Sequence, residues 1–489
     1  MRSITPQNIM IQGTMSGVGK SLIVAGLCRI LKQDGFAPAP FKSQNMSLNS
    51  YVTSDGLEIG RAQAMQSYAA GLEPASEMNP ILLKPTGDTG SQVIVNGRPV
   101  GNMSAREYFA YKKSLIPAIR SAYDKLSSKY APVIIEGAGS PAEINLREND
   151  IVNMRLAEML DVPVLLVGDI DRGGVFAQLY GTVMLLSEKE RRRLRGLIIN
   201  KFRGDPSLLD SGIAEIEEKT GIPVAGVIPY IPDLRLEDED SLTERFNRKP
   251  KRDALIKIAV IRLPRISNFS DLDPFEQNSN VSVTYTADPD LLEASDLIVI
   301  PGSKNTIADM AFLKERGLDT ALIRLCGSIP VFGICGGYQM LGETISDPLN
   351  LEGGGSINGL GLLPVSTVLQ KDKHQKQTEG VIPSGVRGIF SSLSGRRFTG
   401  YEIHMGETDA SGMQAEPPLI STDNDIYGTY IHGIFDRADI ANTVLKALAG
   451  KKGLSIDLTR QLDQRQLRER EYDRLADTLR KYLNPDKLL

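Results

Sequence analysis

The chain has 489 residues, of which 41% are hydrophobic and 24% are charged, and its formal net charge is −4 at pH 7. This length is too great for one ordinary hydrophobic core, so we expect two to three domains in a soluble globular protein. The small net charge excludes a global field that attracts nucleic acid or an anionic membrane, and the sequence has no run of about 18 apolar residues that could cross a bilayer.

The cysteines and the first residues of the chain indicate a compartment. Three cysteines at unrelated spacings argue against a disulfide framework and favour a reducing environment. The N-terminal residues lead into a strand and a glycine-rich loop rather than into the apolar core of a signal peptide. We therefore expect a cytoplasmic protein. With only three histidines and no Cys-x-x-Cys pair, the sequence does not favour a zinc site.

Apolar, β-branched segments alternate with helical segments along most of the chain. The expected strands are residues 8–12, 133–136, 164–167, 197–200 and 224–227, followed by 256–262, 297–300 and 331–333. Most show little polar alternation, as expected for parallel strands that are buried on both faces. The predicted fold class is therefore α/β, with two doubly wound, mostly parallel-sheet domains.

A domain boundary is expected near the middle of the chain. Residues 235–253 are dense in both charge signs and lack apolar periodicity, and a fresh strand follows them. We expect a first domain over 1–234, a charged linker over 235–254, a second domain over 255–450 and a C-terminal extension over 451–489. A charged surface helix or loop inside one domain is the alternative for the linker.

The C-terminal extension contains leucines and tyrosines at near-helical spacing among many charges, within residues 458–483. This pattern predicts an amphipathic helix, which we expect to pack on the second domain. A partner-binding helix is the alternative interpretation.

The segment after the first expected strand has the pattern of a phosphate-binding loop. Residues 13–21 are GTMSGVGKS. Gly17 and Gly19 would let backbone N–H groups converge on phosphate oxygens, Lys20 would reach the β- and γ-phosphates, and Ser21 would bind Mg²⁺. Thr14 stands where the first glycine of the usual pattern should be, so a chance glycine-rich turn is the alternative. The pattern predicts ATP and Mg²⁺ as cofactors.

Polar residues at other strand ends are candidates for the same site. Glu136 ends an apolar strand, where a carboxylate faces the ligand crevice of a parallel sheet and could bind the metal. Asp55 is a second metal candidate, or a helix cap. Lys42 could contact phosphate, or be a solvated surface lysine. Asn200 could contact the adenine, or be a turn residue. Residues 169–174, DIDRGG, form a further polar strand exit.

A second motif lies about three hundred residues later. Residues 332–339 are FGICGGYQ, in which small residues flank Cys335 between an apolar strand and a helix. Such a sharp turn points the side chain into a crevice, and the positive end of the helix favours the thiolate. The N–H of Gly336 is placed to donate to an oxyanion. The alternative is a buried, inert cysteine.

A nucleophilic thiol needs a base, and two histidines compete for that role. His432 follows a strand-like run near the end of the second domain, and we prefer it to His404, which lies in another expected strand. His374 lies in a polar loop. Cys28 and Cys326 lie in helical or apolar contexts without a nearby base, so we expect both thiols to be inert.

The thiol motif resembles the nucleophile motif of class I glutamine amidotransferases. Members of that class usually carry a glutamate two residues after the histidine, but here that position is Ile434. What orients His432 is therefore open, with Asp436 and Glu402 as speculative candidates. The phosphate loop, Glu136 and Asp55 resemble dethiobiotin synthetase.

The order of the two domains resembles the cobyric acid synthase family over essentially the whole chain. The matching segments are FKSQNMS (41–47), SDGLEIGRAQ (54–63), GDIDRGG (168–174), ISNFSD (266–271), PGSKNT (301–306) and GYEIH (400–404). The resemblance implies amidation of the b, d, e and g carboxylates of adenosylcobyrinic acid a,c-diamide, with glutamine as the nitrogen donor and one ATP for each amide. Backbone N–H groups near Gly302 and Gly336 would hold the oxyanion in glutamine hydrolysis.

Three other functions compete with this interpretation. They are the ligase that amidates the a and c carboxylates of the same ring, a nucleotide-switch ATPase whose second domain is an inactive binding module, and a ligase for a cell-wall carboxylate. The expected partners are small molecules, namely a corrinoid carboxylate, L-glutamine and ATP, with no nucleic acid and no membrane. The oligomeric state is left open.

Overall fold

The structure is a computed structural model that describes residues 7–86, 90–236, 246, 250–251, 253–410, 417–459 and 461–483. Most of the predicted linker, residues 235–254, lies outside the described residues, as do the last six residues of the predicted C-terminal extension. Two separate six-stranded sheets, one in each half of the chain, carry the architecture. The predicted α/β fold class is confirmed.

The N-terminal half is built on a parallel sheet with the strand order β12-β11-β10-β1-β9-β2. Its strands are β1 (Ile9–Gly13), β2 (Ala39–Phe41), β9 (Val133–Glu136), β10 (Val164–Asp169), β11 (Leu194–Phe202) and β12 (Val224–Pro229). Its helices are α1 (Lys20–Gln33), α2 (Arg61–Ala70), α3 (Ala105–Tyr111), α4 (Ile116–Ser127), α5 (Met154–Leu160), α6 (Val175–Leu185), α7 (Glu188–Arg191) and α8 (Asp210–Thr220).

Both faces of this sheet are covered by helices, because successive strand residues point to opposite faces. Ile9 and Ile11 of β1 belong to the apolar cluster that contains α1 and part of α2. Met10, between them, belongs to the cluster on the other face, which contains residues of α4, α5 and α6. The strands are apolar throughout because each side of the sheet has its own core.

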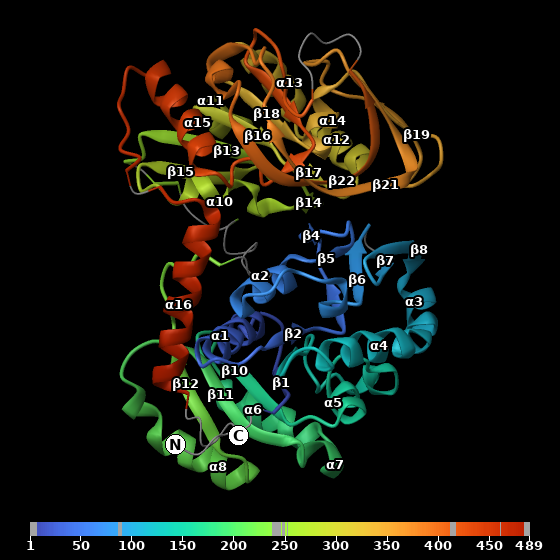
Figure 1. Cartoon of the computed structure of the whole chain (residues 1–489), viewed down its shortest axis with the longest axis vertical. Coiled ribbons are helices and arrows are strands. Elements are labelled where there is room, and N and C mark those ends of the chain that lie inside the picture. The colour runs from blue at the N-terminus through green and yellow to red at the C-terminus, as the bar shows by residue number, and fades with distance from the viewer. Residues whose placement is uncertain are drawn as a thin grey trace.

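Two smaller sheets extend the N-terminal half toward the C-terminal half (Figure 1). One has four strands in the order β3-β6-β7-β8, and the other pairs β4 with β5. Their bounds are β3 (Gln44–Met46), β4 (Ser50–Val52), β5 (Glu58–Gly60), β6 (Ile81–Pro85), β7 (Gly90–Val95) and β8 (Arg98–Ser104). None of these short strands was predicted from the sequence.

The C-terminal half has its own sheet, in the order β15-β13-β16-β18-β24-β23, in which only β23 is antiparallel to its neighbour. Its strands are β13 (Ile256–Ile261), β15 (Val281–Thr286), β16 (Leu297–Ile300), β18 (Val331–Ile334), β23 (Ile420–Ser421) and β24 (Ile426–Thr429). Its helices are α10 (Asp273–Glu276), α11 (Pro289–Glu293), α12 (Thr306–Glu315), α13 (Leu318–Leu325), α14 (Gly336–Leu341) and α15 (Ala438–Lys451).

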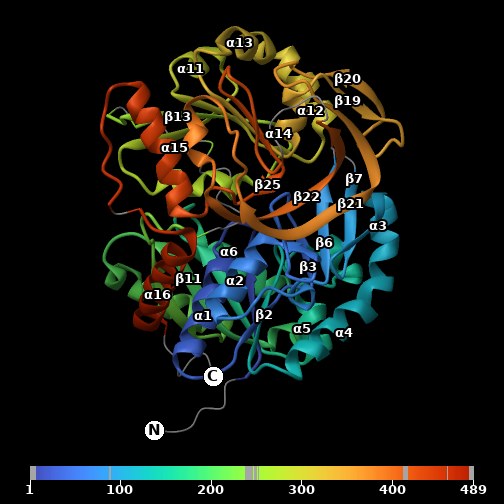
Figure 2. The ribbon, with the colours of Figure 1, turned by 45° about the horizontal axis from the view of Figure 1, so that its top comes forward.

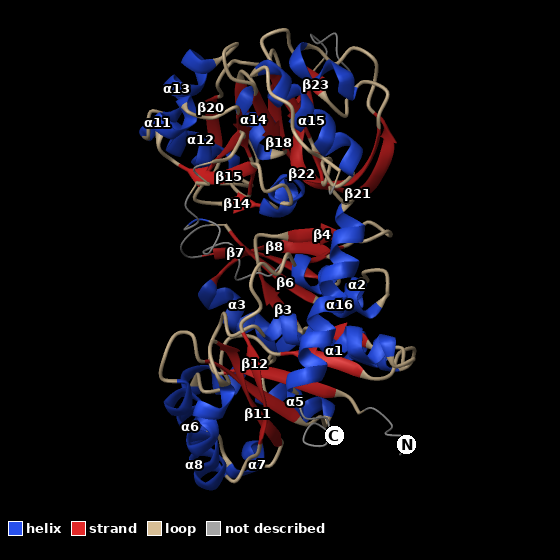
Figure 3. Cartoon of the chain, turned by 90° about the vertical axis from the view of Figure 1, so that its left-hand side faces the viewer, coloured by secondary structure: helices blue, strands red, loops and turns tan. Residues whose placement is uncertain are grey.

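A second, five-stranded sheet in the C-terminal half faces the N-terminal half. Its strands are β19 (Thr344–Asp347), β20 (Gly355–Asn358), β21 (Ser366–Val381), β22 (Arg397–Asp409) and β25 (Ile431–His432). Figure 2 shows the long strands β21 and β22 running across the boundary between the halves. The short pair β14 (Ile266–Ser267) and β17 (Gly302–Ser303) also lies at this boundary (Figure 3).

The last helix, α16 (Gln464–Tyr482), packs along the N-terminal half, so the prediction that it packs on the second domain was wrong (Figure 1). Leu475 and Leu479 lie in the same apolar cluster as residues of α1, and a Cβ added to Gly26 of α1 would lie 2.3 Å from a methyl of Leu479. Arg29 of α1 forms ion pairs with two acidic residues of α16, Glu469 and Asp473. An amphipathic pattern fixes which face of a helix is buried but not which neighbour buries it.

Candidate active site

The phosphate-binding loop of the N-terminal half joins β1 to α1. Gly17 and Gly19 have φ angles of 79° and 92°, a region that glycine enters without strain. The side-chain nitrogen of Asn200 donates to the carbonyl of Val18 (2.8 Å), and a Cβ on Gly19 would lie 2.4 Å from that nitrogen. The predicted residues Gly17, Gly19 and Asn200 are thus brought together, with Asn200 holding the backbone of the loop.

The first residues of α1 face the carboxyl end of β9. The Ser21 hydroxyl donates to Glu136 Oε1 (2.8 Å), and the Lys42 ammonium lies 2.9 Å from the same oxygen. Gln66 donates to the other carboxylate oxygen (2.5 Å). Burial disfavours the charged carboxylate, but the charge and hydrogen bond of Lys42, the hydrogen bond of Gln66 and the charge of Lys20 together hold the pKa of Glu136 below its ordinary value.

Lys20, at the start of α1, is 7% exposed and lies within the loop. Its ammonium donates to the backbone carbonyls of Met15 (3.0 Å) and Gly139 (3.4 Å). These two contacts hold the ammonium group at the loop. The ammonium is therefore positioned for an anion at the end of the loop.

The donor set beside Lys20 suits a hard cation. The hydroxyl of Ser21 and the carboxylate of Glu136 are oxygen ligands, which Mg²⁺ prefers, and they are in contact. Asp55 lies elsewhere, exposed in the turn between β4 and β5, where its carboxylate accepts a hydrogen bond from Thr53. No group of three or more His, Cys, Asp or Glu side chains that could hold a metal occurs among the described residues.

A cavity of about 520 Å³ lies beside the loop, between the two halves. Its walls include Asn200, Lys201 and Tyr230 of the N-terminal half and Leu475 of α16. Asn200, which donates to the carbonyl of Val18 in the loop, is part of the wall of this cavity, so the cavity offers space beside the loop.

The thiol of the C-terminal half lies on a sharp turn between β18 and α14. Cys335 has φ 53° and ψ −110°, a strained conformation for a residue with a side chain, and it is 7% exposed. Position 337, two residues later, requires a glycine because its backbone approaches β16 closely. A Cβ on Gly337 would lie 1.9 Å from the carbonyl oxygen of Ile300. The predicted elbow is present, and it aims the start of α14 at the thiol.

His432 lies on β25, close to this thiol, and is fully buried. Its Nδ1 is 2.7 Å from Asp271 Oδ2, while the other carboxylate oxygen of Asp271 accepts the N–H of Gly433 (2.9 Å). Among the described residues Nε2 of His432 makes no hydrogen bond, so this nitrogen is available to the thiol of Cys335. Burial disfavours the imidazolium, but the charge and hydrogen bond of Asp271, with a further contribution from Cys335, raise the pKa of His432 to about 10.

Asp271 is therefore the carboxylate that orients His432, and both speculative candidates were wrong. Glu402 instead lies 3.1 Å from Lys376 and 3.4 Å from His404, and Asp436 lies 3.7 Å from an arginine of α16. Asp271 precedes His432 by 161 residues, so no local spacing could have revealed the pair. The only signal was its place at the end of the segment ISNFSD.

Gly302 and Gly336 both lie near the cysteine–histidine pair. A Cβ on Gly336 would lie 2.9 Å from the backbone nitrogen of Ser303, and a Cβ on Gly302 would lie 3.2 Å from Cε1 of His432. The start of β17 and the start of α14 are therefore packed against each other beside Cys335. The structure brings together all four residues predicted for this half of the site.

Comparison with known proteins adds a family to this geometry. Residues 9–243 match the family described as the CobQ/CobB/MinD/ParA nucleotide binding domain, and residues 257–440 match the CobB/CobQ-like glutamine amidotransferase domain. The chain is 51% identical to the cobyric acid synthase of Lachnoclostridium phytofermentans, over 99% of this chain and 98% of that protein. It is 50% identical to the cobyric acid synthase of Ruminiclostridium cellulolyticum, over 97% of this chain and 95% of that protein.

The chain belongs to the cobyric acid synthase family. The family accounts for a nucleotide-binding domain and a glutamine amidotransferase domain in one polypeptide. Among solved structures, the signal recognition particle receptor FtsY of Elizabethkingia anophelis in complex with GDP is similar at 17% identity and a TM-score of 0.27, over 51% of this chain and 65% of that one.

The remaining histidines of this family member lie on the sheet that faces the boundary. His404 stacks on Tyr430, with ring centroids 3.7 Å apart, and its Nδ1 is 2.8 Å from the carbonyl of Gly406. His374 stacks in turn on His404 (5.0 Å). His404 lines the cavity beside Cys335, but it has no carboxylate contact as close as that of His432.

The other two cysteines lie away from this site. Cys28 is fully buried in α1, and burial raises the pKa of its thiol far above the ordinary value. Cys326 is partly buried, and burial raises the pKa of its thiol as well. Both thiols therefore remain protonated at neutral pH, which agrees with the prediction that they are inert.

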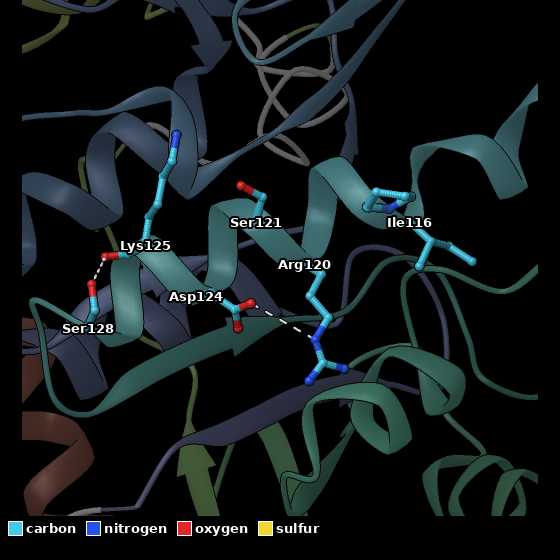
Figure 4. Close-up of a pocket in the computed structure, with 7 residues that line it drawn as sticks. Ile116, Arg120, Ser121, Asp124, Lys125 and Ser128 are labelled. Carbon is cyan, nitrogen blue, oxygen red and sulfur yellow. Dashed lines mark hydrogen bonds and ion pairs between the residues drawn. The ribbon is translucent and has the colours of Figure 1, made fainter.

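A shallow depression on α4 is unrelated to the candidate sites (Figure 4). The residues that line it all come from positions 116–128, and Arg120 and Asp124 face each other there at 4.0 Å. None of the predicted site residues lies there.

Among the described residues, no helix has the length and apolar character that crossing a membrane requires.

Proposed function

We propose that this chain uses ATP and glutamine to amidate the b, d, e and g carboxylates of adenosylcobyrinic acid a,c-diamide, giving adenosylcobyric acid in cobalamin biosynthesis. The name of its full-length relatives supports this substrate. The observation that carries the proposal is that one chain holds both a phosphate-binding loop and a cysteine–histidine–aspartate arrangement. Neither device alone makes an amide.

The N-terminal half would activate the carboxylate. A carboxylate resists attack by ammonia because its leaving group is oxide, and phosphorylation by ATP replaces that group with phosphate. Lys20 and the N–H groups of Gly17 and Gly19 would hold the phosphates. Asn200 would fix the backbone of the loop on the side of the adenine. Ser21 and Glu136 would hold Mg²⁺. Bound Mg²⁺ would neutralise charge on the phosphates.

The C-terminal half would release ammonia. His432 takes the proton of the Cys335 thiol, the sulfur attacks the side-chain amide carbon of glutamine, and the C–N bond breaks as His432 passes that proton to the leaving nitrogen. Asp271 keeps the ring of His432 in the orientation that presents Nε2. Backbone N–H groups at Gly302 and Gly336 would hold the oxyanion, and one such donor is typically worth about 3 kcal/mol. Water then hydrolyses the glutamyl thioester.

Ammonia would then attack the acyl phosphate in the other half of the chain, and phosphate leaves. At neutral pH free ammonia in bulk water is mostly ammonium, which is no nucleophile, so we propose direct transfer of ammonia across the boundary between the halves. Because the reaction consumes ATP and needs a reduced thiol, we expect it in the cytoplasm. The substrates are small molecules, and we propose no role for nucleic acid or membrane.

Replacing Cys335 by Ala tests this division of tasks. We expect glutamine-dependent amidation to fall to background, while amidation with high ammonium salt continues, because carboxylate activation needs only the N-terminal half. The readout is the mass of the corrinoid product, which also counts the amides added. Loss of activity with both nitrogen sources would contradict the proposal. Addition of two amides to the a and c positions would point to the related diamide synthase instead.

A further inference from the structure

A small cavity against Cys335 is lined by residues from both halves of the chain. The C-terminal half contributes Lys304, Lys373 and Glu352, and the N-terminal half contributes Lys84. The cavity has a volume of about 40 Å³. That is room for about three water molecules, so the walls must separate when a larger molecule enters.

Lys84 reaches this cavity because two neighbours fix its ammonium group. Lys84 lies on β6, is 4% exposed and donates to Glu58 Oε1 (2.9 Å) and to the hydroxyl of Ser50 (3.0 Å). Glu58 is fully buried on β5, and its other oxygen accepts hydrogen bonds from Lys373 and Gln375 of the C-terminal half. Glu58 therefore ties a lysine of each half to one carboxylate.

The β4–β5 hairpin holds this arrangement against the catalytic residues. The N–H of Ser50 donates to the side chain of Asn268 (3.1 Å), and the hydroxyl of Tyr401 donates to the carbonyl of Ser50 (3.2 Å). The ring of Tyr401 stacks on His432 with centroids 5.4 Å apart. Figures 1 and 3 show β4 at the boundary, beneath the sheet that contains β21 and β22.

The buried groups around the cavity carry an excess of positive charge. Among the described residues that line the cavity or pair directly with its lysines, the three cations Lys84, Lys304 and Lys373 are accompanied by the two carboxylates of Glu58 and Glu352. Lys304 is 9% exposed, and its ammonium makes no hydrogen bond or ion pair within the described part of the chain. The charge of Glu352 acts on Lys304 without a direct contact. A buried cation that no acceptor contacts is costly, so the cavity is suited to an anionic group.

We propose that Lys304, Lys373 and Lys84 form a subsite for the α-carboxylate of glutamine, so that the N-terminal half completes the glutamine site. Glu352, on the same cavity, faces the α-ammonium group. The inference rests on the proposed use of glutamine by Cys335. It adds that glutamine binds well only when the two halves are docked, because one of the three cations belongs to the other half.

The test is the Lys84→Met variant, measured by glutamine hydrolysis and by amidation with ammonium salt. We expect the KM for glutamine to rise about 10- to 100-fold, because one charge-assisted hydrogen bond to the substrate is lost, and kcat to change less. Ammonia-dependent amidation should stay within about twofold of the unaltered protein, since carboxylate activation does not use this lysine. Lys125→Met, an exposed lysine of the same half on α4 (Figure 4), is the matched control.

A glutamine analogue keeps the test decisive if the methionine variant does not fold. Glutamine α-amide lacks the carboxylate charge, so the unaltered protein should prefer glutamine strongly, Lys84→Arg should keep most of that preference, and Lys84→Met should lose most of it. An unaltered protein that hydrolyses both compounds equally well would overturn the inference, as would a normal KM in Lys84→Met. Failure of corrinoid amidation in the unaltered protein, with this preference intact, would instead overturn the proposed function alone.

Discussion

The two reactive turns of this molecule solve the same geometric problem in different ways. Both follow a buried parallel strand and lead directly into a helix, β1 into α1 and β18 into α14. The first turn spans residues 14–19 and places glycines at positive φ, so that backbone groups surround a ligand. The second turn consists of one residue, Cys335, which itself takes φ 53°.

The length of the turn decides what the helix end can do. A six-residue loop leaves an empty space in front of the helix N-terminus, and that space suits a phosphate group. A one-residue turn fills the space with the side chain of that residue, so the helix end acts on a thiol instead. One supersecondary unit therefore gives a binding site or a nucleophile, depending on where the backbone strain is placed.

Replacing Lys20 by Ala should have the largest effect on this comparison. We expect amidation to fall about 10³-fold or more with glutamine and with ammonium salt alike, because the charge that stabilises phosphoryl transfer is lost whatever the nitrogen source. Glutamine hydrolysis without corrinoid should change little. Turnover with ammonium salt that survives in this variant would count against the phosphate-loop assignment.

Replacing Asp271 by Asn should affect only the second turn. Glutamine-dependent activity should drop by about 10²- to 10³-fold, because an amide at this position no longer fixes the tautomer of His432 or balances its charge. Ammonia-dependent amidation serves as the internal control. Glu402→Gln is the matched variant, since Glu402 pairs with Lys376 and His404 instead, and an equal loss in that variant would refute the assignment of Asp271.

Alanine at a glycine of the first turn and at a glycine of the helix that follows the second turn compares the two kinds of strain. In Gly19→Ala a methyl group would lie 2.4 Å from Asn200, in a backbone region that costs about 1–2 kcal/mol for other residues. In Gly337→Ala it would lie 1.9 Å from a backbone oxygen of β16, an overpacking cost of about 1–3 kcal/mol. The first variant should weaken amidation with both nitrogen sources, and the second should weaken only that with glutamine. Product masses distinguish the two patterns.

The smallest effect is the pH dependence of stability. The pKa of His432 is raised from an ordinary 6.5 to about 10, so the pair with Asp271 contributes fully below pH 6.5 and its contribution is lost as the pH rises through 10. Denaturant unfolding of the C-terminal half should show this loss, and Asp271→Asn should be less dependent on pH across the same range. A variant with the same pH profile as the unaltered protein would contradict the pairing.

The sequence predicted the central strands of the two six-stranded sheets well because parallel strands that are buried on both faces are apolar throughout. Strands such as β9, at residues 133–136, and β16, at residues 297–300, were predicted with their observed bounds. Both turns were predictable because each needs glycines or a cysteine at fixed offsets. Ser21 and Glu136 were predicted as separate candidates, and the register that pairs Ile11 with Glu136 brings them together.

The features that sequence reasoning missed depend on contacts between distant segments. Asp271 reaches His432 only through the packing of the C-terminal half, and Gln66 reaches Glu136 only because α2 lies against α1. The long strands β21 and β22 are rich in exposed polar residues, so they lack the apolar pattern of a core strand. The predicted packing of α16 on the second domain was wrong because the apolar pattern of a helix contains no information about its neighbour.

The course of α16 has a mechanical consequence. Its first residue, Gln464, donates its N–H to the carbonyl of Asp436 in the C-terminal half, and its later turns lie on α1 of the N-terminal half. The helix therefore couples the two lobes, and any opening of the boundary must bend α16 or detach it from α1. A protease cut that removes α16 would release this coupling and would also uncover the apolar side of α1, the helix that begins at the phosphate loop.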